Sequence, residues 1–337
     1  MKIIVEKNIP YIQGILEKYA EVDYLSYQEI TRAVVKDADV LLVRTRNVCN
    51  SELLEGSRCK FIGTATIGTD HIDLEYCREH GIMVKSAPGC NAPAVAQYVL
   101  SSIGHWLKKE YIFNTAGITL GVVGVGHVGS IVARWAKQLG FKVLLNDPPL
   151  RRAMGSADFV PLSKLMADAD IITFHTPLVS TGIDATYHLA SRPFINGLQN
   201  CRLLINSSRG AVVDNAALVE FMETSSLKDV VIDCWEGEPE INRTLLEKAF
   251  IATPHIAGYS AEGKMRATAM ILEALAEHFG WELEIPQIEA PKEGAAEVTL
   301  EGIMSSYNPL EDTKALKSAP EAFESLRNNY NFRLEVR

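Results

Sequence analysis

Three short stretches in the second half of the chain carry residue types that can perform acid–base chemistry together. NSSRG, DCWEGEP and TPHIAG contain Arg209, Glu238 and His255. Histidine titrates near neutral pH and can take the proton of an alcohol, and a neighbouring carboxylate fixes the ring and favours its charged form. A guanidinium is always charged and can pair with a substrate carboxylate. The combination is suited to the oxidation of a secondary alcohol flanked by a carboxylate.

Each of the three residues also has an ordinary structural explanation. His255 fits a satisfied core histidine, Glu238 a turn acid before Pro239, and Arg209 a surface ion pair. All three, however, come at the ends of successive predicted strands. Ligands of open parallel sheets bind outside the carboxyl ends of the strands. We therefore expect these three side chains to converge on one catalytic site.

The stretch GVVGVGHVG (121–129) supplies the features of a nucleotide site. A predicted strand at 119–125 leads into Gly124, Gly126 and Gly129, and a predicted helix at 130–139 follows. The glycines allow a tight turn, a close approach of the pyrophosphate and close packing of helix on strand, and the amides at the helix start hold the phosphates. The motif in this context predicts a bound dinucleotide.

The next predicted strand, 142–146, ends at Asp147, which indicates the type of dinucleotide. A carboxylate there accepts hydrogen bonds from the ribose hydroxyls and repels a 2'-phosphate, which favours NAD over NADP. Arg151 and Arg152 weaken this preference, because a nearby arginine can neutralise a 2'-phosphate. NAD remains the predicted cofactor.

Short β-branched runs alternate with helical patterns through most of the chain, as in parallel α/β proteins. Predicted strands fall at 2–5, 40–43, 61–63 and 82–85, and then at 119–125, 142–146, 171–174, 202–206, 230–233 and 250–253. A predicted helix at 93–108 separates the two series, and another at 261–280 can return the chain to the first domain.

From Trp281 onward the pattern changes. The segment 285–297 is rich in Pro, Glu and Ala, EVTLEGI (297–303) alternates like an exposed strand, and 319–330 predicts a short amphipathic helix. A tail of this size is small for an independent core. We expect it to pack on the main body or on another subunit.

Composition narrows the class of protein. The 337 residues are 47% hydrophobic and 22% charged, which is typical of globular proteins. The net charge of -9 opposes a broad nucleic-acid surface, and no apolar run reaches the roughly 20 residues of a membrane span. The N-terminus does not resemble a signal peptide, so we expect a cytoplasmic protein.

Six scattered cysteines without a C-x-x-C pair predict buried free thiols and no metal site.

In these motifs and their order, residues 1 to about 280 resemble the D-2-hydroxyacid dehydrogenase family. The matching stretches are the glycine motif with Asp147, HTPL (175–178), NSSRGAVVD (206–214), DCWEGEP and TPHIAG. The resemblance implies that Arg209, Glu238 and His255 form the catalytic triad. It also implies two doubly wound parallel-sheet domains of the Rossmann or flavodoxin-like type, with an active-site cleft between them. The expected bounds are 1–93 plus 256–280 for the substrate domain and 94–255 for the NAD domain.

Further stretches resemble one branch of the family, whose members oxidise a phosphorylated 2-hydroxy acid and carry an additional C-terminal dimerisation domain. These are VRTR (43–46), GTATIGTDHID (63–73), APGCNAPAVAQYV (87–99), NDPP (146–149), HIAGYSAEGK (255–264) and the tail segments YNPLEDTKALK and FESLRNNYNFRLE. The resemblance implies a small α+β dimerisation domain at 281–337 and a homodimer.

This resemblance also assigns contacts residue by residue. The matched substrate contacts are Thr45, Thr66 and Tyr259, and Arg44 and Arg46 are our candidates for the substrate phosphate. The matched NAD contacts, beside the three glycines, are His127, Val128, Asp147, Thr176, Ser207, Ser208, Arg209, Asp233 and Gly258. Ser207 and Ser208 replace the Ala-Cys that is more usual before the arginine, a change that is conservative in size.

Two other functions stay open at this stage. The first is a dehydrogenase of the phosphoglycerate or glyoxylate/hydroxypyruvate type, with the same triad and another substrate. The second is a nucleotide-sensing binding protein of the corepressor kind, which keeps the fold and binds a partner. The tail and HIAGYSAEGK speak against the first, and the intact Arg209, Glu238 and His255 argue against the second.

Overall fold

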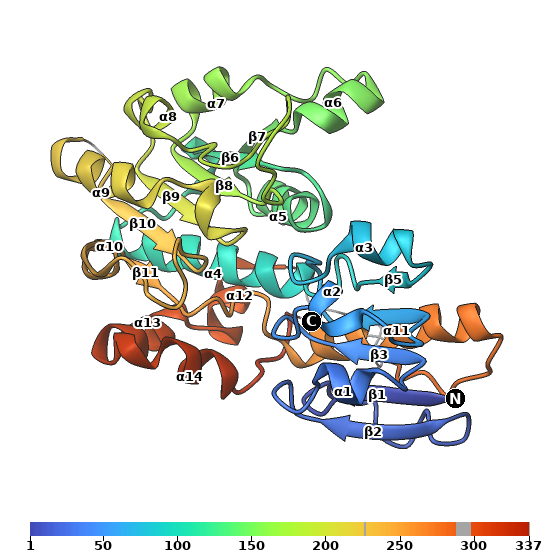
Figure 1. The fold of residues 1–337 in the computed structure, drawn as a ribbon. Helices are drawn as coiled ribbons and strands as arrows, with labels where there is room; N and C mark the ends of the chain where they lie inside the picture. Colours follow the sequence, from blue (N-terminus) through green and yellow to red (C-terminus); the bar gives the residue numbers. More distant parts are fainter. Residues whose placement is uncertain (226, 288–297, 337) are drawn as a thin grey trace. The chain divides into compact units, whose positions relative to one another are not determined.

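The computed structural model describes residues 1–225, 227–287 and 298–336, which form two compact units (Figure 1). The first unit comprises Met1–Asn91 and Ser260–Lys292, and the second comprises Ala92–Tyr259 and Glu293–Arg337. Both are α/β units built on parallel sheets, as the sequence predicted. The cleft expected between them stays a prediction.

The first unit contains a five-stranded parallel sheet in the order β2-β1-β3-β4-β5. The strands β3 and β4 are wholly buried, in keeping with a parallel sheet covered on both faces. The strand β2 was not predicted, because its sequence EVDYL is polar and lies at the sheet edge. The strands are β1 (Lys2–Glu6), β2 (Glu21–Leu25), β3 (Val40–Val43), β4 (Phe61–Thr64) and β5 (Met83–Lys85).

The described residues of this unit form the helices α1 (Arg32–Val35), α2 (Ser51–Leu54), α3 (Leu74–Glu79) and α11 (Ala261–Phe279). The helix α11 is the predicted return of the chain. It begins where the Ser260 side chain accepts a hydrogen bond from the Gly263 amide, and ends at Gly280, whose φ of 68° suits glycine. Its residues Ile271 and Leu275 pack in one core with the buried strand residues Ile3 and Leu42.

The second unit contains a six-stranded parallel sheet in the order β11-β10-β9-β8-β6-β7. β7, the next strand in the chain, lies on one side of β6, and β8 to β11 follow on its other side. The strand order therefore reverses between β6 and β8. This reversal is where open α/β sheets bind ligands. The strands are β6 (Thr119–Val123), β7 (Lys142–Asn146), β8 (Ile171–Phe174), β9 (Leu203–Asn206), β10 (Asp229–Ile232) and β11 (Ile251–Ala252).

Helices cover both faces of this sheet, because successive strand residues point to opposite sides. Leu203 and Ile205 join a core with α4 and α5, whereas Leu204 joins a core with α8, α9 and α10. The helices are α4 (Ala92–Lys109), α5 (His127–Gln138), α6 (Pro148–Met154), α7 (Leu162–Asp168), α8 (Arg192–Asn196), α9 (Asn215–Thr224) and α10 (Arg243–Lys248), with 3-10 turns η1 (Thr115–Gly117) and η2 (Gly210–Val212).

The tail differs from the prediction in its secondary structure. Its described part is helical, with α12 (Leu300–Ser306), α13 (Pro309–Ser318), η3 (Pro320–Ala322) and α14 (Phe323–Asn328). The strand expected over EVTLEGI is therefore wrong from Val298 on, while Glu297 lies outside the described residues. The reason is local, because the Thr299 hydroxyl accepts from the Gly302 amide at 3.0 Å and caps a helix. The helix predicted at 319–330 is confirmed as η3 and α14.

Residues 298–336 belong to the second unit, which confirms that this part of the tail packs on the main body. A dimerisation domain at 281–337 stays a prediction. A side chain at Gly104 would lie 2.6 Å from Met304 Sδ, so this glycine lets α12 approach α4 closely. The helix α13 lies beside the edge strand β11, where Thr313 Oγ1 accepts from the Ala252 amide at 3.1 Å. An edge strand with unpaired backbone groups needs such a cover.

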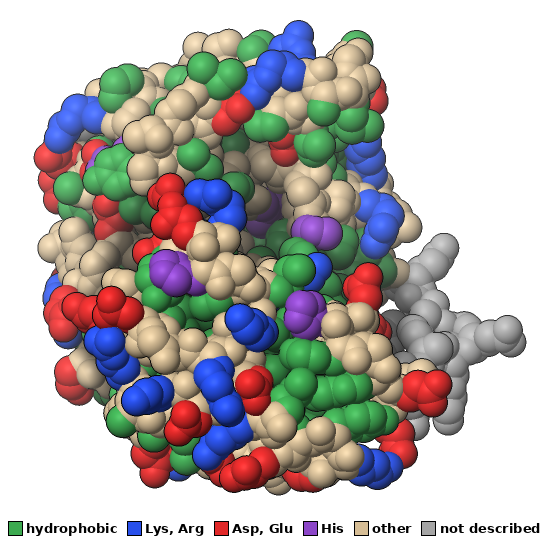
Figure 2. All heavy atoms as spheres, turned by 45° about the vertical axis from the view of Figure 1, so that its right-hand side comes forward, with side chains coloured by type: hydrophobic (Ala, Val, Ile, Leu, Met, Phe, Trp, Pro, Cys, Tyr) green, Lys and Arg blue, Asp and Glu red, His purple; other side chains and the backbone are tan. Residues whose placement is uncertain are grey.

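Surface and interior agree with the composition. Figure 2 shows lysine and arginine side chains interspersed with aspartate and glutamate on the face drawn. All six cysteines are free and buried, as predicted. Within the described ranges, no helix combines the length and apolarity that crossing a bilayer requires.

Candidate active site

His255 and Glu238 form a half-buried pair at the carboxyl edge of the second sheet. His255 follows β11, and Glu238 lies in the loop that follows β10. His255 Nδ1 lies 2.8 Å from Glu238 Oε2 and 3.1 Å from Oε1. No residue in the described part of the chain hydrogen-bonds Nε2 of His255. One ring nitrogen is thus held by a carboxylate while the other is available to a ligand.

Asp233 holds the backbone that carries His255. Its Oδ1 accepts from Thr253 Oγ1 at 2.7 Å and from the Ile256 amide at 2.8 Å, and its Oδ2 accepts from the Ala257 amide at 3.0 Å. His255 has a φ of 57°, a conformation that is unfavourable for a residue with a side chain and persists only where its surroundings impose it. Burial raises the pKa of Asp233, and these donors together with His255 oppose the rise.

Arg209 sits on a loop pressed against the Glu238 segment. A side chain at Gly210 would lie 1.9 Å from the Trp235 carbonyl oxygen, so only glycine permits this approach. Asn206 Nδ2 donates to the Arg209 carbonyl at 2.9 Å and holds the loop at the end of β9. The structure thus brings Arg209 to the strand end next to the one that precedes Glu238.

The charge of Glu238 is stabilised by its neighbours. Burial by itself would raise the pKa of this carboxyl, but His255, the Trp235 amide at 2.8 Å and the Arg327 guanidinium together lower it. Glu238, His255 and Cys234 also offer ligand atoms within 4.8 Å of one another, a grouping that a metal could use. Burial raises the pKa of the Cys234 thiol well above its ordinary value, and a protonated thiol is a poor ligand.

The glycine motif forms a cradle at the reversal point of the sheet. Gly124 follows β6 with a φ of 84°, and a side chain there would meet the His175 backbone at 2.8 Å. A side chain at Gly129 would lie 1.9 Å from the Gly124 carbonyl oxygen, so this glycine lets α5 pack on the turn. A side chain at Gly126 would meet nothing within 4 Å. The space over Gly126 is open for a phosphate beside the start of α5.

Polar groups around this cradle fit NAD. Two buried hydroxyl oxygens, Thr176 Oγ1 after β8 and Ser207 Oγ after β9, have no hydrogen-bond partner among the described residues. Buried polar groups are normally paired, so both hydroxyls are available to hydrogen-bond a bound ligand at this edge. Asp147 accepts from the Val125 amide at 2.8 Å and from the Leu150 amide at 2.9 Å, and these bonds hold its carboxylate at the end of β7.

The other predicted NAD contacts lie at the same edge. His127 and Val128 are the first residues of α5, Ser208 is buried beside Asn206, and Gly258 follows the His255 loop. Asp233 is 1% exposed, and both of its oxygens hold protein groups. The sequence did not reveal this supporting role. Direct contact between Asp233 and NAD stays a prediction.

In the first unit, the predicted substrate residues gather at one sheet edge. Arg44, Thr45 and Arg46 follow β3, and Thr66 follows β4, its neighbour in the sheet. Thr66 Oγ1 lies 2.7 Å from Thr64 Oγ1 and donates to the Gly68 carbonyl at 3.2 Å. Arg44 Nη1 lies 3.9 Å from Oε2 of the buried Glu6, and the Arg46 guanidinium lies over the Tyr27 ring.

Sequence reasoning missed two functional candidates, Arg327 and Arg333. Both lie in the tail stretch FESLRNNYNFRLE, which supported the resemblance without any residue being singled out. Both arginines contact Tyr259, a predicted substrate contact and the last residue of the segment Ala92–Tyr259 of the second unit. The available signal for these residues was two arginines spaced among aromatic residues. It could not identify their partner Tyr259, which lies about 70 residues earlier in the chain.

The fold and this site define a class of protein, and comparison with known families agrees. Residues 93–257 match the family described as the D-isomer specific 2-hydroxyacid dehydrogenase NAD-binding domain. Solved structures of similar fold include a D-lactate dehydrogenase from Aquifex aeolicus complexed with NAD and lactic acid. It has a TM-score of 0.68 and 24% identity, and the match covers 86% of this chain and all of that one. The TT0316 protein from Thermus thermophilus is also similar, with a TM-score of 0.67 and 26% identity over 86% of this chain and 100% of that one.

Relatives that match nearly the whole chain narrow the class. A Bacteroides thetaiotaomicron protein named erythronate-4-phosphate dehydrogenase is 48% identical over 340 residues, with 99% of this chain and 97% of the relative covered. An Escherichia fergusonii protein of the same name is 40% identical, with 99% and 92% covered. The chain belongs to the erythronate-4-phosphate dehydrogenase family, within the D-2-hydroxyacid dehydrogenases. It is an NAD-dependent oxidoreductase.

Proposed function

We propose that this protein oxidises 4-phospho-D-erythronate at C2 to (R)-3-hydroxy-2-oxo-4-phosphooxybutanoate. The observation that carries the reaction type is the 2.8 Å pair of His255 and Glu238 at the same sheet edge as the glycine cradle. The choice of substrate rests on full-length relatives that bear the name erythronate-4-phosphate dehydrogenase.

The residues of the second unit divide the chemistry among them. Bound NAD supplies the acceptor for the hydride that leaves C2. His255 takes the hydroxyl proton on Nε2, because its Nδ1 is engaged by Glu238. Glu238 keeps the ring oriented and stabilises the imidazolium that forms. Arg209 pairs with the substrate carboxylate and polarises the developing carbonyl.

The substrate phosphate requires cations, since the protein as a whole is acidic. Arg44 and Arg46 are the candidates for this role, and Thr45, Thr66 and Tyr259 complete the proposed substrate contacts. The ion pair of Arg44 with Glu6 at 3.9 Å is long, which leaves its guanidinium donors free to prefer a closer anion.

The setting of the reaction is proposed from the same resemblance. The family's additional C-terminal segment mediates dimerisation, and we assign a homodimer to this chain. Six buried free thiols suit a reducing compartment such as the cytoplasm. The reaction would then serve pyridoxal 5'-phosphate biosynthesis.

The test is to incubate the pure protein with NAD and 4-phospho-D-erythronate and to follow NADH by absorbance, with a 2-oxo acid acceptor added in parallel. A panel of phosphoglycerate, glycerate, lactate and unphosphorylated erythronate provides the comparison. The proposal predicts the highest kcat/KM for 4-phospho-D-erythronate. Faster oxidation of phosphoglycerate or glycerate would assign the chain to another dehydrogenase type. Absence of NADH formation with every acid would contradict an enzymatic role.

A further inference from the structure

Arg333 fastens the C-terminal segment to the loop that carries His255. Arg333 is 9% exposed, and its side chain contacts three carbonyls within 256–259. Nη1 donates to the Ile256 carbonyl at 3.1 Å and to the Tyr259 carbonyl at 3.2 Å, and Nη2 donates to the Ala257 carbonyl. The guanidinium also lies 4.2 Å from the centre of the Tyr307 ring. The catalytic loop is thus held from one side by Asp233 and from the other by the tail.

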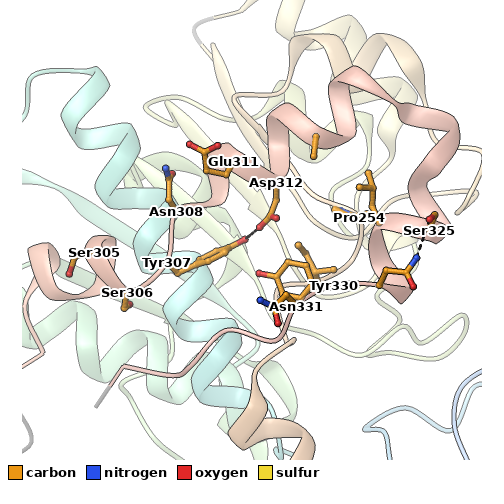
Figure 3. Close-up of a pocket in the computed structure, with 14 residues that line it drawn as sticks. Pro254, Ser305, Ser306, Tyr307, Asn308, Glu311, Asp312, Ser325, Tyr330 and Asn331 are labelled. Carbon is orange, nitrogen blue, oxygen red and sulfur yellow. Dashed lines mark hydrogen bonds between the residues drawn. The ribbon is translucent and has the colours of Figure 1, made fainter. Parts of the chain in front are cut away.

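The tail keeps its own shape around this attachment. Pro254 and Ile256, the neighbours of His255, line a pocket of about 580 Å³ together with residues of α12, α13 and α14 (Figure 3). The Tyr307 hydroxyl donates to Asp312 Oδ2 at 2.7 Å, and Arg333 Nη1 donates to the Tyr330 hydroxyl at 3.4 Å. These bonds link the tail helices to the anchoring arginine.

Arg327 reaches from α14 to the catalytic groups themselves. Its Nη1 lies 3.8 Å from Glu238 Oε2, the same oxygen that contacts His255 Nδ1. Its Nε donates to the Tyr259 hydroxyl at 3.3 Å. The side chain of Arg327 is 22% exposed, so water screens these interactions only in part. One guanidinium therefore bridges the orienting carboxylate and the proposed substrate contact.

This geometry has a consequence for the hydrogen bond between Glu238 and His255. A guanidinium beside Glu238 favours the charged carboxylate, which accepts the Nδ1 proton of His255 and leaves the lone pair of Nε2 available. The same guanidinium donates to the Tyr259 hydroxyl. The Tyr259 ring packs edge-on against the rings of Tyr330 and Phe332, with ring centres 6.0 and 6.1 Å away. One guanidinium thus contacts both Glu238 and Tyr259.

We propose that Arg327 is a positioning residue of the hydride-transfer site and that the C-terminal segment is, through it, part of the catalytic apparatus. The proposal rests on the proposed function, since it assigns Arg327 a role in that reaction. It goes further by giving the tail a role in turnover beside its proposed role in dimerisation.

The experiment compares full-length Arg327→Met and Arg327→Lys with Lys314→Met. Lys314 is an exposed tail cation whose side chain makes no hydrogen bond or ion pair with the described residues. Steady-state rates are expressed per NADH-binding site, so misfolded protein does not count. We expect Arg327→Met to lower kcat by about 10- to 100-fold and to leave the KM for NAD within about twofold. Arg327→Lys should recover part of kcat, because it restores the charge without the fork. Lys314→Met should match the wild type.

Two further measurements distinguish positioning from support of the fold. In a cycle with Tyr259→Phe, the two losses should be less than additive, since each variant removes the same bond. Amide exchange at 255–259 should be faster in Arg327→Met than in Lys314→Met. A kcat for Arg327→Met within twofold of the wild type would overturn the proposal, as would full additivity together with unchanged exchange. An inactive wild-type chain would refute the proposed function instead, and unchanged exchange in Arg327→Met would then overturn this inference separately.

Discussion

The described residues of the second unit include two histidine–glutamate pairs of similar geometry, and only one of the two is suited to catalysis. His255 contacts Glu238 at 2.8 Å, and His188 contacts Glu236 at 2.6 Å. Both histidines have a positive φ, 57° and 48°, and their side chains are 29% and 28% exposed. Distance, exposure and backbone conformation therefore do not tell the two pairs apart.

The partners of the second ring nitrogen distinguish the pairs. His188 Nε2 contacts Glu236, and its Nδ1 lies 3.9 Å from Asp214 Oδ2, so both nitrogens face carboxylates. Both acids also hold the start of α9, where Glu236 accepts from the Asn215 amide and Asp214 from the Ala217 amide. In His255 only Nδ1 contacts a carboxylate, that of Glu238. A histidine acts as a base only where one nitrogen is free to reach a substrate.

Replacing each histidine by alanine gives the largest expected contrast. His255→Ala should lower kcat by about 10²- to 10⁴-fold, the usual contribution of a general base. His188→Ala should leave kcat within about threefold, because its two carboxylate partners serve a helix terminus. Steady-state assays with NAD measure the rates, and NADH fluorescence titration shows whether the cofactor site survives. A His255→Ala enzyme with wild-type kcat would contradict the base assignment.

The acids that hold the backbone beside each histidine give the second contrast. Asp233→Ala leaves three buried donors without their acceptor and should lower the free energy of unfolding by about 3 kcal/mol, together with activity. Asp214→Ala removes one helix cap and should cost about 1 kcal/mol. Urea denaturation of both variants measures the difference. Equal losses would mean that Asp233 does not impose the strained backbone of His255.

In the first unit, the arginine proposed to bind the substrate phosphate can be compared with an arginine that has no proposed role. Arg44→Ala should raise KM for the phosphorylated acid about tenfold, the effect of losing one charge-assisted contact, and should change KM for unphosphorylated erythronate much less. Arg58→Ala is the control, since this exposed arginine pairs with Asp39 elsewhere in the same unit. Equal effects of Arg44→Ala on both substrates would remove this residue from the phosphate site.

The pH dependence of stability provides the smallest effect. The pKa of Glu238 lies below its ordinary value of 4.5, so the charged carboxylate stabilises the folded state. This contribution is fully present above about pH 4.5 and is lost as the pH falls through the lower, folded-state pKa. The unfolding free energy of Glu238→Gln should therefore fall about 1 kcal/mol below the wild type at pH 7 and approach it in acid. A difference independent of pH would contradict a charge-based contribution.

Much of the fold was predictable because its signals are local. The buried runs VLLV and IITF have no polar residue to place in water, and Gly124, Gly126 and Gly129 between strand and helix mark the nucleotide turn. The placement of Arg209, Glu238 and His255 at one sheet edge could be predicted because parallel strands bring their carboxyl ends together, and their catalytic roles stay a proposal. The strand expected over EVTLEGI was wrong because the helix cap of Thr299 outweighs a short alternation of apolar and polar residues. The strand β2 was not predicted because its sequence, at the sheet edge, is polar.

The sequence by itself determined the residues of the proposed chemistry: three residue types at strand ends, a glycine turn and an acid proposed to bind the ribose. Only the tertiary structure decided which groups restrain them. Asp233 supports the strained His255 loop, Arg333 fastens it to the tail, and Arg327 joins Glu238 to Tyr259 across residues far apart in the chain. The physical reason is that a periodic pattern reports which face of an element is buried, whereas a hydrogen bond between distant loops depends on how complete elements pack.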